Sequence, residues 1–128
     1  MRYLIDTHVL IWASFEEERL SEQALNLISS EENEILISAA SAWEITTKVR
    51  IGKLPGAQYL ADHFVESVTE SGYLLLDISV EHAVRAGRMP GAHKDPFDRI
   101  LAAQALHEDI PILSIDAQLD VFGVRREW

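Results

Sequence analysis

The stretch Tyr3-Leu4-Ile5-Asp6, close to the start of the chain, indicates the fold. A short apolar run of this kind is typical of a strand buried on both faces, and Asp6 ends it. The next residues, 8–15, have the spacing of a helix. A buried strand followed at once by a helix is the repeating unit of parallel α/β folds.

The same alternation continues to the end of the chain. Further strands are expected at 34–38, 73–76 and 112–115, with a short last strand beginning near Val124. Helices are expected at 21–29, 40–51, 57–71, 79–87 and 95–108, with Ser21, Ser79 and Asp95 as their N-caps where the spacing allows. We therefore predict an α/β fold, a three-layer α/β/α sandwich with a mainly parallel central sheet and right-handed crossovers.

Length and composition indicate one domain, residues 1–128. The chain has no cysteine, which excludes disulfides and thiolate metal sites and favours a cytoplasmic setting. No apolar run approaches the ~20 residues that span a bilayer, so no membrane partner is expected. Asp6 and His8 interrupt the apolar start, which favours a strand and helix there over a signal peptide.

The net charge of -10 argues against broad nucleic-acid binding driven by counterion release. It does not exclude a local basic surface. Seven of the 11 Lys and Arg residues fall within 48–53 and 85–99. Two interpretations stay open for these stretches: solvated helix ends and loops, or a surface for an anionic ligand.

Four carboxylates have positions that suggest a common site. Asp6 and Asp116 directly follow expected strands, Glu44 lies early in a helix that begins just past a strand, and Asp98 lies in the first turn of a helix. In an open parallel sheet, ligands bind beyond the carboxyl ends of the strands, near a switch in strand order. We expect the four acids to converge at that edge.

Each acid also has a structural explanation. Asp6 and Asp116 have the position of helix caps, and Asp98 complements a helix N-terminus. Glu44 has Lys48 four residues on, a surface pair worth only ~0.3–0.5 kcal/mol. Asp77 also follows a strand, but turn chemistry explains it, so it is left out of the site.

The histidines give no comparable signal. The five of them show no ligand-like spacing on one helix face. His93 lies in the loop before Asp98, where substrate contact is conceivable, but an ordinary loop histidine is the favoured interpretation.

The set of acids, more than any one of them, predicts a metal site. Crowded carboxylates repel each other, which raises their pKa values and costs stability unless a cation neutralises them. Oxygen ligands without Cys or paired His favour Mg²⁺, or Mn²⁺, over zinc. Such ions lower the pKa of a bound water and stabilise both oxygens of an in-line displacement at phosphorus.

Four segments resemble the motifs of PIN-domain ribonucleases of the VapC toxin type, and because they are spread along the sequence the resemblance spans nearly the whole chain. They are Leu4–Leu10, Ser38–Ile45, His93–Ala105 and Leu113–Asp116. The resemblance implies an α/β/α sandwich whose acids bind magnesium or manganese and cleave single-stranded regions of RNA. Asp6, Glu44, Asp98 and Asp116 match the four acids in order, and Thr7 and Ser114 match the neighbouring hydroxyl positions.

On this basis we expect a magnesium-dependent endoribonuclease in which a metal-activated water cleaves the phosphodiester bond, leaving a 3′-hydroxyl and a 5′-phosphate. Asp6, Asp98 and Asp116 hold the metal, and Glu44 completes the shell or orients the water. Asp98 is favoured over Asp95 as the ligand because Asp95 is better placed as a cap. The candidates for contact with the RNA backbone are Arg85, Arg88, Lys94 and Arg99.

The resemblance also implies partners: a cognate antitoxin protein that blocks the site, a homodimer, and a higher assembly with the antitoxin. Two other functions are compatible with an α/β chain of this length. A receiver-type phosphoacceptor domain has an acidic pair after its first strand and a Lys after its last long one, whereas here Thr7 follows Asp6 and Asp116 stands where the Lys would be. A non-toxin PIN protein that processes or binds RNA is the other alternative.

Overall fold

The computed structural model describes all 128 residues and contains one five-stranded sheet, in which every neighbouring pair of strands is parallel. The strand order is β3-β2-β1-β4-β5. The strands are β1 (Arg2–Ile5), β2 (Glu34–Ser38), β3 (Leu74–Leu76), β4 (Ile112–Leu113) and β5 (Arg126–Glu127). The prediction of a parallel α/β sheet is confirmed.

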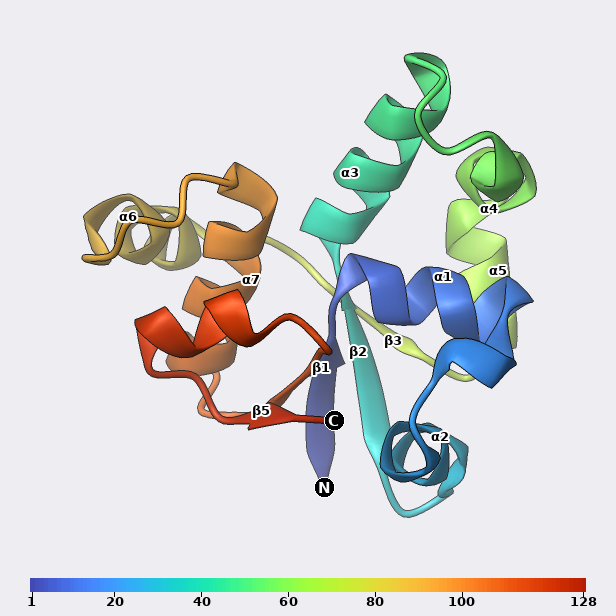
Figure 1. Ribbon diagram of the computed structural model, residues 1–128, viewed down its shortest axis with the longest axis horizontal. Coiled ribbons are helices and arrows are strands. Elements are labelled where there is room, and N and C mark those ends of the chain that lie inside the picture. The colour runs from blue at the N-terminus through green and yellow to red at the C-terminus, as the bar shows by residue number, and fades with distance from the viewer.

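Helices cover both faces of this sheet (Figure 1). The α-helices are α1 (Thr7–Phe15), α2 (Glu22–Ser29), α3 (Ala39–Arg50), α4 (Gln58–Asp62), α5 (Phe64–Glu70), α6 (Val80–Arg88) and α7 (Pro96–His107). Short 3-10 helices occur at η1 (Glu17–Arg19), η2 (Pro55–Ala57) and η3 (Ala117–Phe122). None of the helices is long and apolar enough to cross a membrane.

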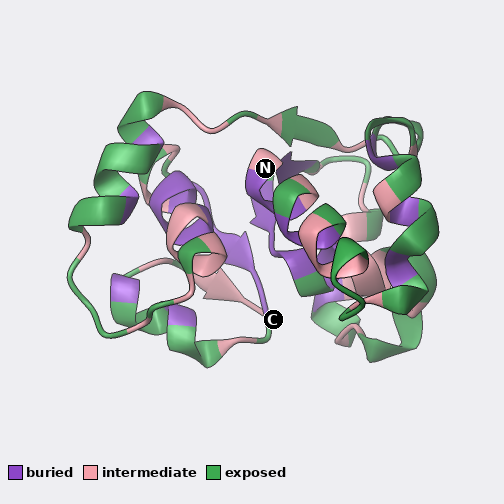
Figure 2. Cartoon of the chain, turned by 90° about the horizontal axis from the view of Figure 1, so that it is seen from above, coloured by how far each residue is buried: buried purple, intermediate pink, exposed green.

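Alternation along β1 gives the molecule two hydrophobic cores, one on each side of the sheet. Tyr3 and Ile5 belong to a core with α1, α2, α4 and α5, whereas Leu4 belongs to a core with α7 and η3. Successive side chains of a strand point to opposite faces, so a strand covered on both sides must be apolar throughout. Figure 2 shows the resulting buried centre with exposed outer surfaces.

The strand order reverses between β1 and β4. From β1 the chain proceeds through β2 to β3 on one side, then crosses to β4 and β5 on the other. The segments after β1 and β4 pack into different cores, α1 into one and η3 into the other. A reversal of this kind opens a crevice at the carboxyl ends of the two strands.

Three predicted boundaries were wrong. The expected helix at 57–71 is divided into α4 and α5 at His63, where the backbone leaves helical geometry although no proline or glycine marks the place. β4 ends at Leu113 because the Ser114 side chain accepts a hydrogen bond from the Asp116 amide, which turns the chain. β5 begins at Arg126 rather than Val124 because Gly123 ends η3 in a left-handed conformation.

Candidate metal centre at the carboxyl edge of the sheet

Asp6 connects three elements at the carboxyl edge of the sheet. It caps α1, with Oδ1 accepting a hydrogen bond of 2.9 Å from the Val9 amide. Its Oδ2 accepts from the hydroxyl of Ser114, just past β4. The side chain is buried, with only 5% of the residue exposed. Asp6 therefore caps α1, as its position in the sequence predicts. Its carboxylate is also held in place where the strand order reverses.

Burial raises the pKa of Asp6 to about 6. The hydrogen bonds from Ser114 and Val9 and the neighbouring His8 oppose this rise, while the charge of Asp98 adds to it. Loss of hydration disfavours the charged carboxylate more than these bonds favour it. The site therefore holds a negative charge that a cation would stabilise.

Ser114 lies between two of the predicted acids. It is fully buried, donates to Asp6 and accepts from the Asp116 amide at 3.0 Å. Asp116 in turn caps η3, with Oδ1 accepting from the Gln118 amide at 3.0 Å. One hydroxyl thus fixes the relative positions of the ends of β1 and β4.

Asp95 and Asp98 have different positions at the start of α7. Asp95 is the N-cap, and its Oδ1 accepts from the amides of Phe97 and Asp98. The side chain of Asp98 instead contacts His93, with 2.7 Å between Oδ2 and Nε2. Burial, followed by the charges of Asp95 and Glu44, raises the pKa of Asp98, while the hydrogen bond to His93 opposes the rise.

The acids meet at one edge of the sheet. One side-chain ligand atom each from His93, Asp98 and Asp116 lies within 4.8 Å of the others. The charge of Asp98 acts on Asp6, and that of Glu44 acts on Asp98. Asp98 and Asp116 therefore lie together, and Asp6 and Glu44 each interact with the charge of Asp98. His93 joins them, although an ordinary loop histidine had been favoured; its place five residues before Asp98 was the only sequence signal.

Glu44 lies deeper than a surface pair would require. Only 4% of the residue is exposed, and Nζ of Lys48 donates to its Oε2. The i, i+4 pair is thus present, but a buried carboxylate depends on its cation far more than an exposed one does. Sequence reasoning missed Lys48 as a part of the site.

Thr7 is not in contact with an acid. Its hydroxyl lies 2.9 Å from that of Ser41, and both side chains are buried. This pair joins the start of α1 to α3, the helix that carries Glu44. Thr7 therefore positions the two helices relative to each other, and Ser41 is a second residue that the sequence did not reveal.

The four cationic residues predicted to contact the RNA backbone fall into two groups. Arg85, Arg88 and Lys94 are exposed. The guanidinium of Arg99 instead donates to the carbonyl oxygens of Ala86, Met89 and His93. Arg99 holds the 89–95 loop against α6, so we replace its predicted RNA contact with this structural role.

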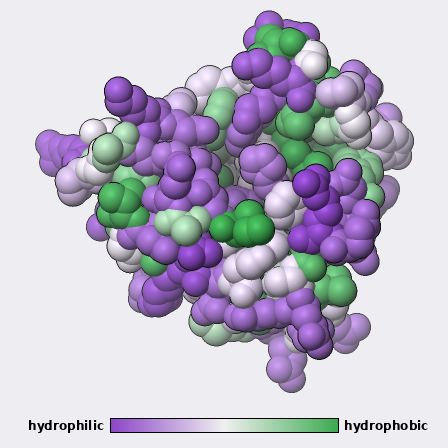
Figure 3. Space-filling model, viewed as in Figure 1, coloured by the Kyte–Doolittle hydropathy of each residue, from purple (hydrophilic) through white to green (hydrophobic).

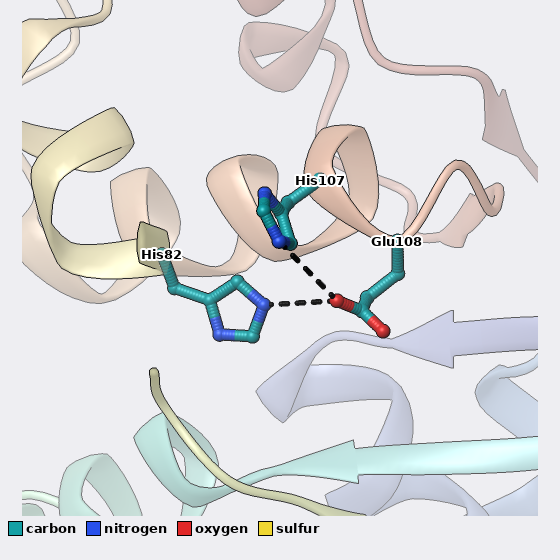
Figure 4. Close-up of side chains that lie close together, drawn as sticks. All are labelled: His82, His107 and Glu108. Atoms are coloured by element: carbon teal, nitrogen blue, oxygen red, sulfur yellow. Dashed lines mark hydrogen bonds and ion pairs between the residues drawn. The ribbon is translucent and has the colours of Figure 1, made fainter. Parts of the chain in front are cut away.

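A second group of titratable side chains lies at the opposite end of α7 from Asp98 (Figure 4). Glu108 lies 3.1 Å from His82 and 4.0 Å from His107. The Ser79 amide donates to Nδ1 of His82 at 2.9 Å, which leaves the ring hydrogen on Nε2, where Glu108 accepts it. Because this nitrogen has no free lone pair for a metal, the group is a structural connection between α6 and α7.

The residues at the acid site do fit a divalent ion. Asp6, Asp98 and Asp116 offer carboxylate oxygens, and burial and mutual repulsion raise the pKa values of Asp6 and Asp98. Oxygen donors of this kind suit Mg²⁺ or Mn²⁺. Nε2 of His93 lies 2.7 Å from Oδ2 of Asp98, so the imidazole holds the carboxylate and the donor set stays oxygen-based.

A family model described as PIN domain matches residues 3–124. Ribonuclease VapC16 of Mycobacterium tuberculosis (strain ATCC 25618 / H37Rv) is 38% identical over 74 residues. That match covers 55% of this chain and 51% of the relative, so the chain spans about half the length of that protein.

Several solved structures share the fold. VapBC2 from Rickettsia felis, bound to a promoter DNA fragment, has a TM-score of 0.71 at 19% identity, covering 99% of this chain and 98% of that one. VapC20 from Mycobacterium tuberculosis, a toxin that cleaves the sarcin-ricin loop, has a TM-score of 0.65 at 16% identity, with 95% of each chain covered. A toxin-antitoxin complex from Klebsiella pneumoniae has a TM-score of 0.61 at 16% identity, covering 89% and 86%. At these identities the likeness shows the fold.

Proposed function

The chain belongs to the PIN-domain family, and on this basis we propose that it is a magnesium-dependent endoribonuclease acting as the toxin of a toxin-antitoxin pair. One observation carries the proposal: the buried Asp6 is joined through Ser114 to Asp116, and Asp116 lies together with Asp98. The ribonuclease activity named for VapC16 supports the choice of RNA.

In this proposal Asp6, Asp98 and Asp116 hold Mg²⁺, with Mn²⁺ as the alternative, and Glu44 completes the shell or orients the attacking water. The ion supplies Lewis acidity, lowering the pKa of a bound water and neutralising charge that develops on the phosphate. The chain's own residues keep the donors in place. Ser114 orients Asp6, and the Asp95 cap fixes the helix turn that carries Asp98.

The reaction is hydrolysis of a phosphodiester bond. Water adds to phosphorus in line as the bond to the 3′ oxygen breaks, leaving a 3′-hydroxyl and a 5′-phosphate. Glu44, held by Lys48, would orient the water or accept its proton. Arg85, Arg88 and Lys94 are the remaining candidates to contact the RNA backbone, which would position the strand without reading its sequence.

The proposed partners are a cognate antitoxin, which covers the acid site, and a second copy of this chain, with a higher assembly in the antitoxin complex. The toxin-antitoxin complex among the similar structures supports this choice. The receiver-domain alternative is wrong, because doubly wound folds of that type have the strand order 2-1-3-4-5, whereas here the order is β3-β2-β1-β4-β5.

The test is cleavage of single-stranded RNA by purified, nuclease-free protein with Mg²⁺. Asp98→Asn is expected to lower the rate by at least about 100-fold with an unchanged circular dichroism spectrum, because the shape of the side chain is kept while its charge is lost. Asp77→Asn is the matched control, since Asp77 also follows a strand but is exposed and outside the site. Retained cleavage in Asp98→Asn would contradict the proposal.

A growth assay separates a toxin from an RNA-processing PIN protein. Expression of the intact chain should arrest growth, and co-expression of a protein encoded beside it should relieve the arrest. Active RNA cleavage in vitro without any effect on growth would favour the processing role.

A further inference from the structure

Two aromatic rings in contact, one exposed and one half-buried, belong to residues that directly precede predicted acids. Trp43 on α3 and Phe97 on α7 pack edge to face, with 5.0 Å between ring centroids and an angle of 78° between ring planes. Trp43 is 61% exposed, whereas Trp12 and Trp128, the other two tryptophans, are half-buried and pack against each other. An exposed indole leaves a large apolar surface in water.

The position of the pair is tied to the acids through the chain. Trp43 immediately precedes Glu44, and Phe97 immediately precedes Asp98. Neighbouring Cα atoms are about 3.8 Å apart, and successive helical side chains differ by about 100° in direction. Each aromatic residue is therefore the sequence neighbour of an acid, and its side chain leaves the helix about 100° away from that of the acid. The two rings contact each other, and the charge of Glu44 acts on Asp98, so the aromatic pair and these two acids lie where α3 approaches α7.

The charge of the protein adds a reason for a stacking contact. The net charge of -10 argues against broad RNA binding driven by counterion release. Stacking of an unpaired base on an aromatic ring does not depend on charge and accepts every base. It also requires a base that is free of a duplex, so it favours single-stranded RNA.

Resting on the proposed ribonuclease function, we propose that Trp43, supported by Phe97, is a base-stacking subsite for an unpaired nucleobase next to the scissile phosphate. Trp43 is a binding residue and takes no part in bond cleavage. The contact sets a requirement for single-stranded RNA without reading its sequence.

The first experiment measures binding without cleavage, in an Asp6→Asn background. The probes are an eight-nucleotide oligoadenylate and an abasic ribose-phosphate oligomer of the same length and charge. The oligoadenylate should quench tryptophan fluorescence, and Trp43→Phe should remove the quenching. Trp43→Ala should raise the Kd for the oligoadenylate roughly 5- to 150-fold and leave the weaker Kd for the abasic oligomer unchanged.

Tyr59→Ala is the matched control, because Tyr59 is 65% exposed but lies on α4 and stacks with His63. Its Kd values should equal those of the parent. Equal oligoadenylate affinity in Trp43→Ala and the parent would overturn the subsite. The subsite would also be overturned if Trp43→Ala weakened the binding of a protein partner but not the binding of RNA.

The second experiment uses the active protein and keeps the two proposals distinguishable. Trp43→Ala should raise KM for single-stranded RNA while kcat stays within a few-fold, and Trp43→Phe should restore most of the loss. Normal cleavage with an unchanged KM in Trp43→Ala would overturn the subsite and leave the nuclease intact. Base-dependent quenching in a protein that cleaves no RNA would keep the subsite and remove the proposed activity.

Discussion

At the scale of single residues, Asp6 shows how a functional acid opposes stability. Its pKa of about 6 in the folded protein exceeds the ordinary value of 3.8. Between about pH 4 and pH 6 the folded state therefore keeps a proton that the unfolded chain has lost, and stability falls as the pH rises through this window. Above it, the charged carboxylate costs about 3 kcal/mol of folding free energy.

Asp6→Asn should therefore stabilise the protein at pH 7.5 in the absence of divalent ions, by about 1–3 kcal/mol. The amide oxygen can keep the Val9 hydrogen bond, and the amide hydrogens can reach Ser114, whose hydroxyl then accepts. The gain should disappear near pH 4, where the wild-type side chain is protonated in the folded protein. Urea unfolding at the two pH values measures both.

Asp77→Asn provides the comparison, because Asp77 is exposed. Its free energy of unfolding should differ little from the wild type at either pH. An Asp6→Asn protein no more stable than the wild type at pH 7.5 would show that the buried charge costs nothing.

At the scale of elements, the N-terminus of α7 divides its tasks between two acids three residues apart. Asp95 satisfies the free amides of the first turn, and Asp98 extends to the site. Asn caps a helix about as well as Asp does, whereas Ala does not. Substitutions that keep or remove the cap can therefore separate the two roles.

Asp95→Asn should leave both stability and RNA cleavage nearly unchanged. Asp95→Ala should lower the free energy of unfolding by about 1 kcal/mol because the cap is lost. Asp98→Asn should be at least as stable as the wild type, because burial also raises the pKa of Asp98, but should lose cleavage. Thermal unfolding and a cleavage assay on the three variants measure these effects. Loss of cleavage in Asp95→Asn with retention in Asp98→Asn would make Asp95 the ligand in place of Asp98.

At the scale of the whole molecule, the acidic excess and the acid site both favour binding of a divalent cation. The face seen in Figure 3 is mainly hydrophilic, with apolar side chains in small separate groups, and the net charge is -10. A divalent ion at the switch point would neutralise repulsion between segments from distant parts of the chain. It should therefore stabilise the fold as a whole, since a ligand that binds only the folded state raises its stability.

Mg²⁺ at about 100 times its Kd should raise the Tm by roughly 5–10 °C. NaCl at equal ionic strength is the control for general screening, and EDTA should reverse the shift. The Asp98→Asn protein should show a much smaller shift. Equal shifts in the two proteins would place the ion elsewhere.

The sequence by itself determined the strands, most of the helices and the placement of acids at strand ends. Strand patterns and caps depend on residues within about four positions of each other, as Asp95 and Ser21 show. The order of predicted elements was therefore correct. In a parallel sheet, acids that follow the strands lie at the same edge, at the carboxyl ends of the strands. His63 is the exception at this scale, because no local signal marks the break between α4 and α5.

Only the tertiary structure decided which groups contact each other at that edge. It placed β1 beside β4, so Ser114 reaches Asp6 across 108 positions of sequence. It also drew His93 to Asp98 and turned Arg99 inward. Such contacts depend on strand order and on burial, and both are set by the packing of the whole chain rather than by any short segment.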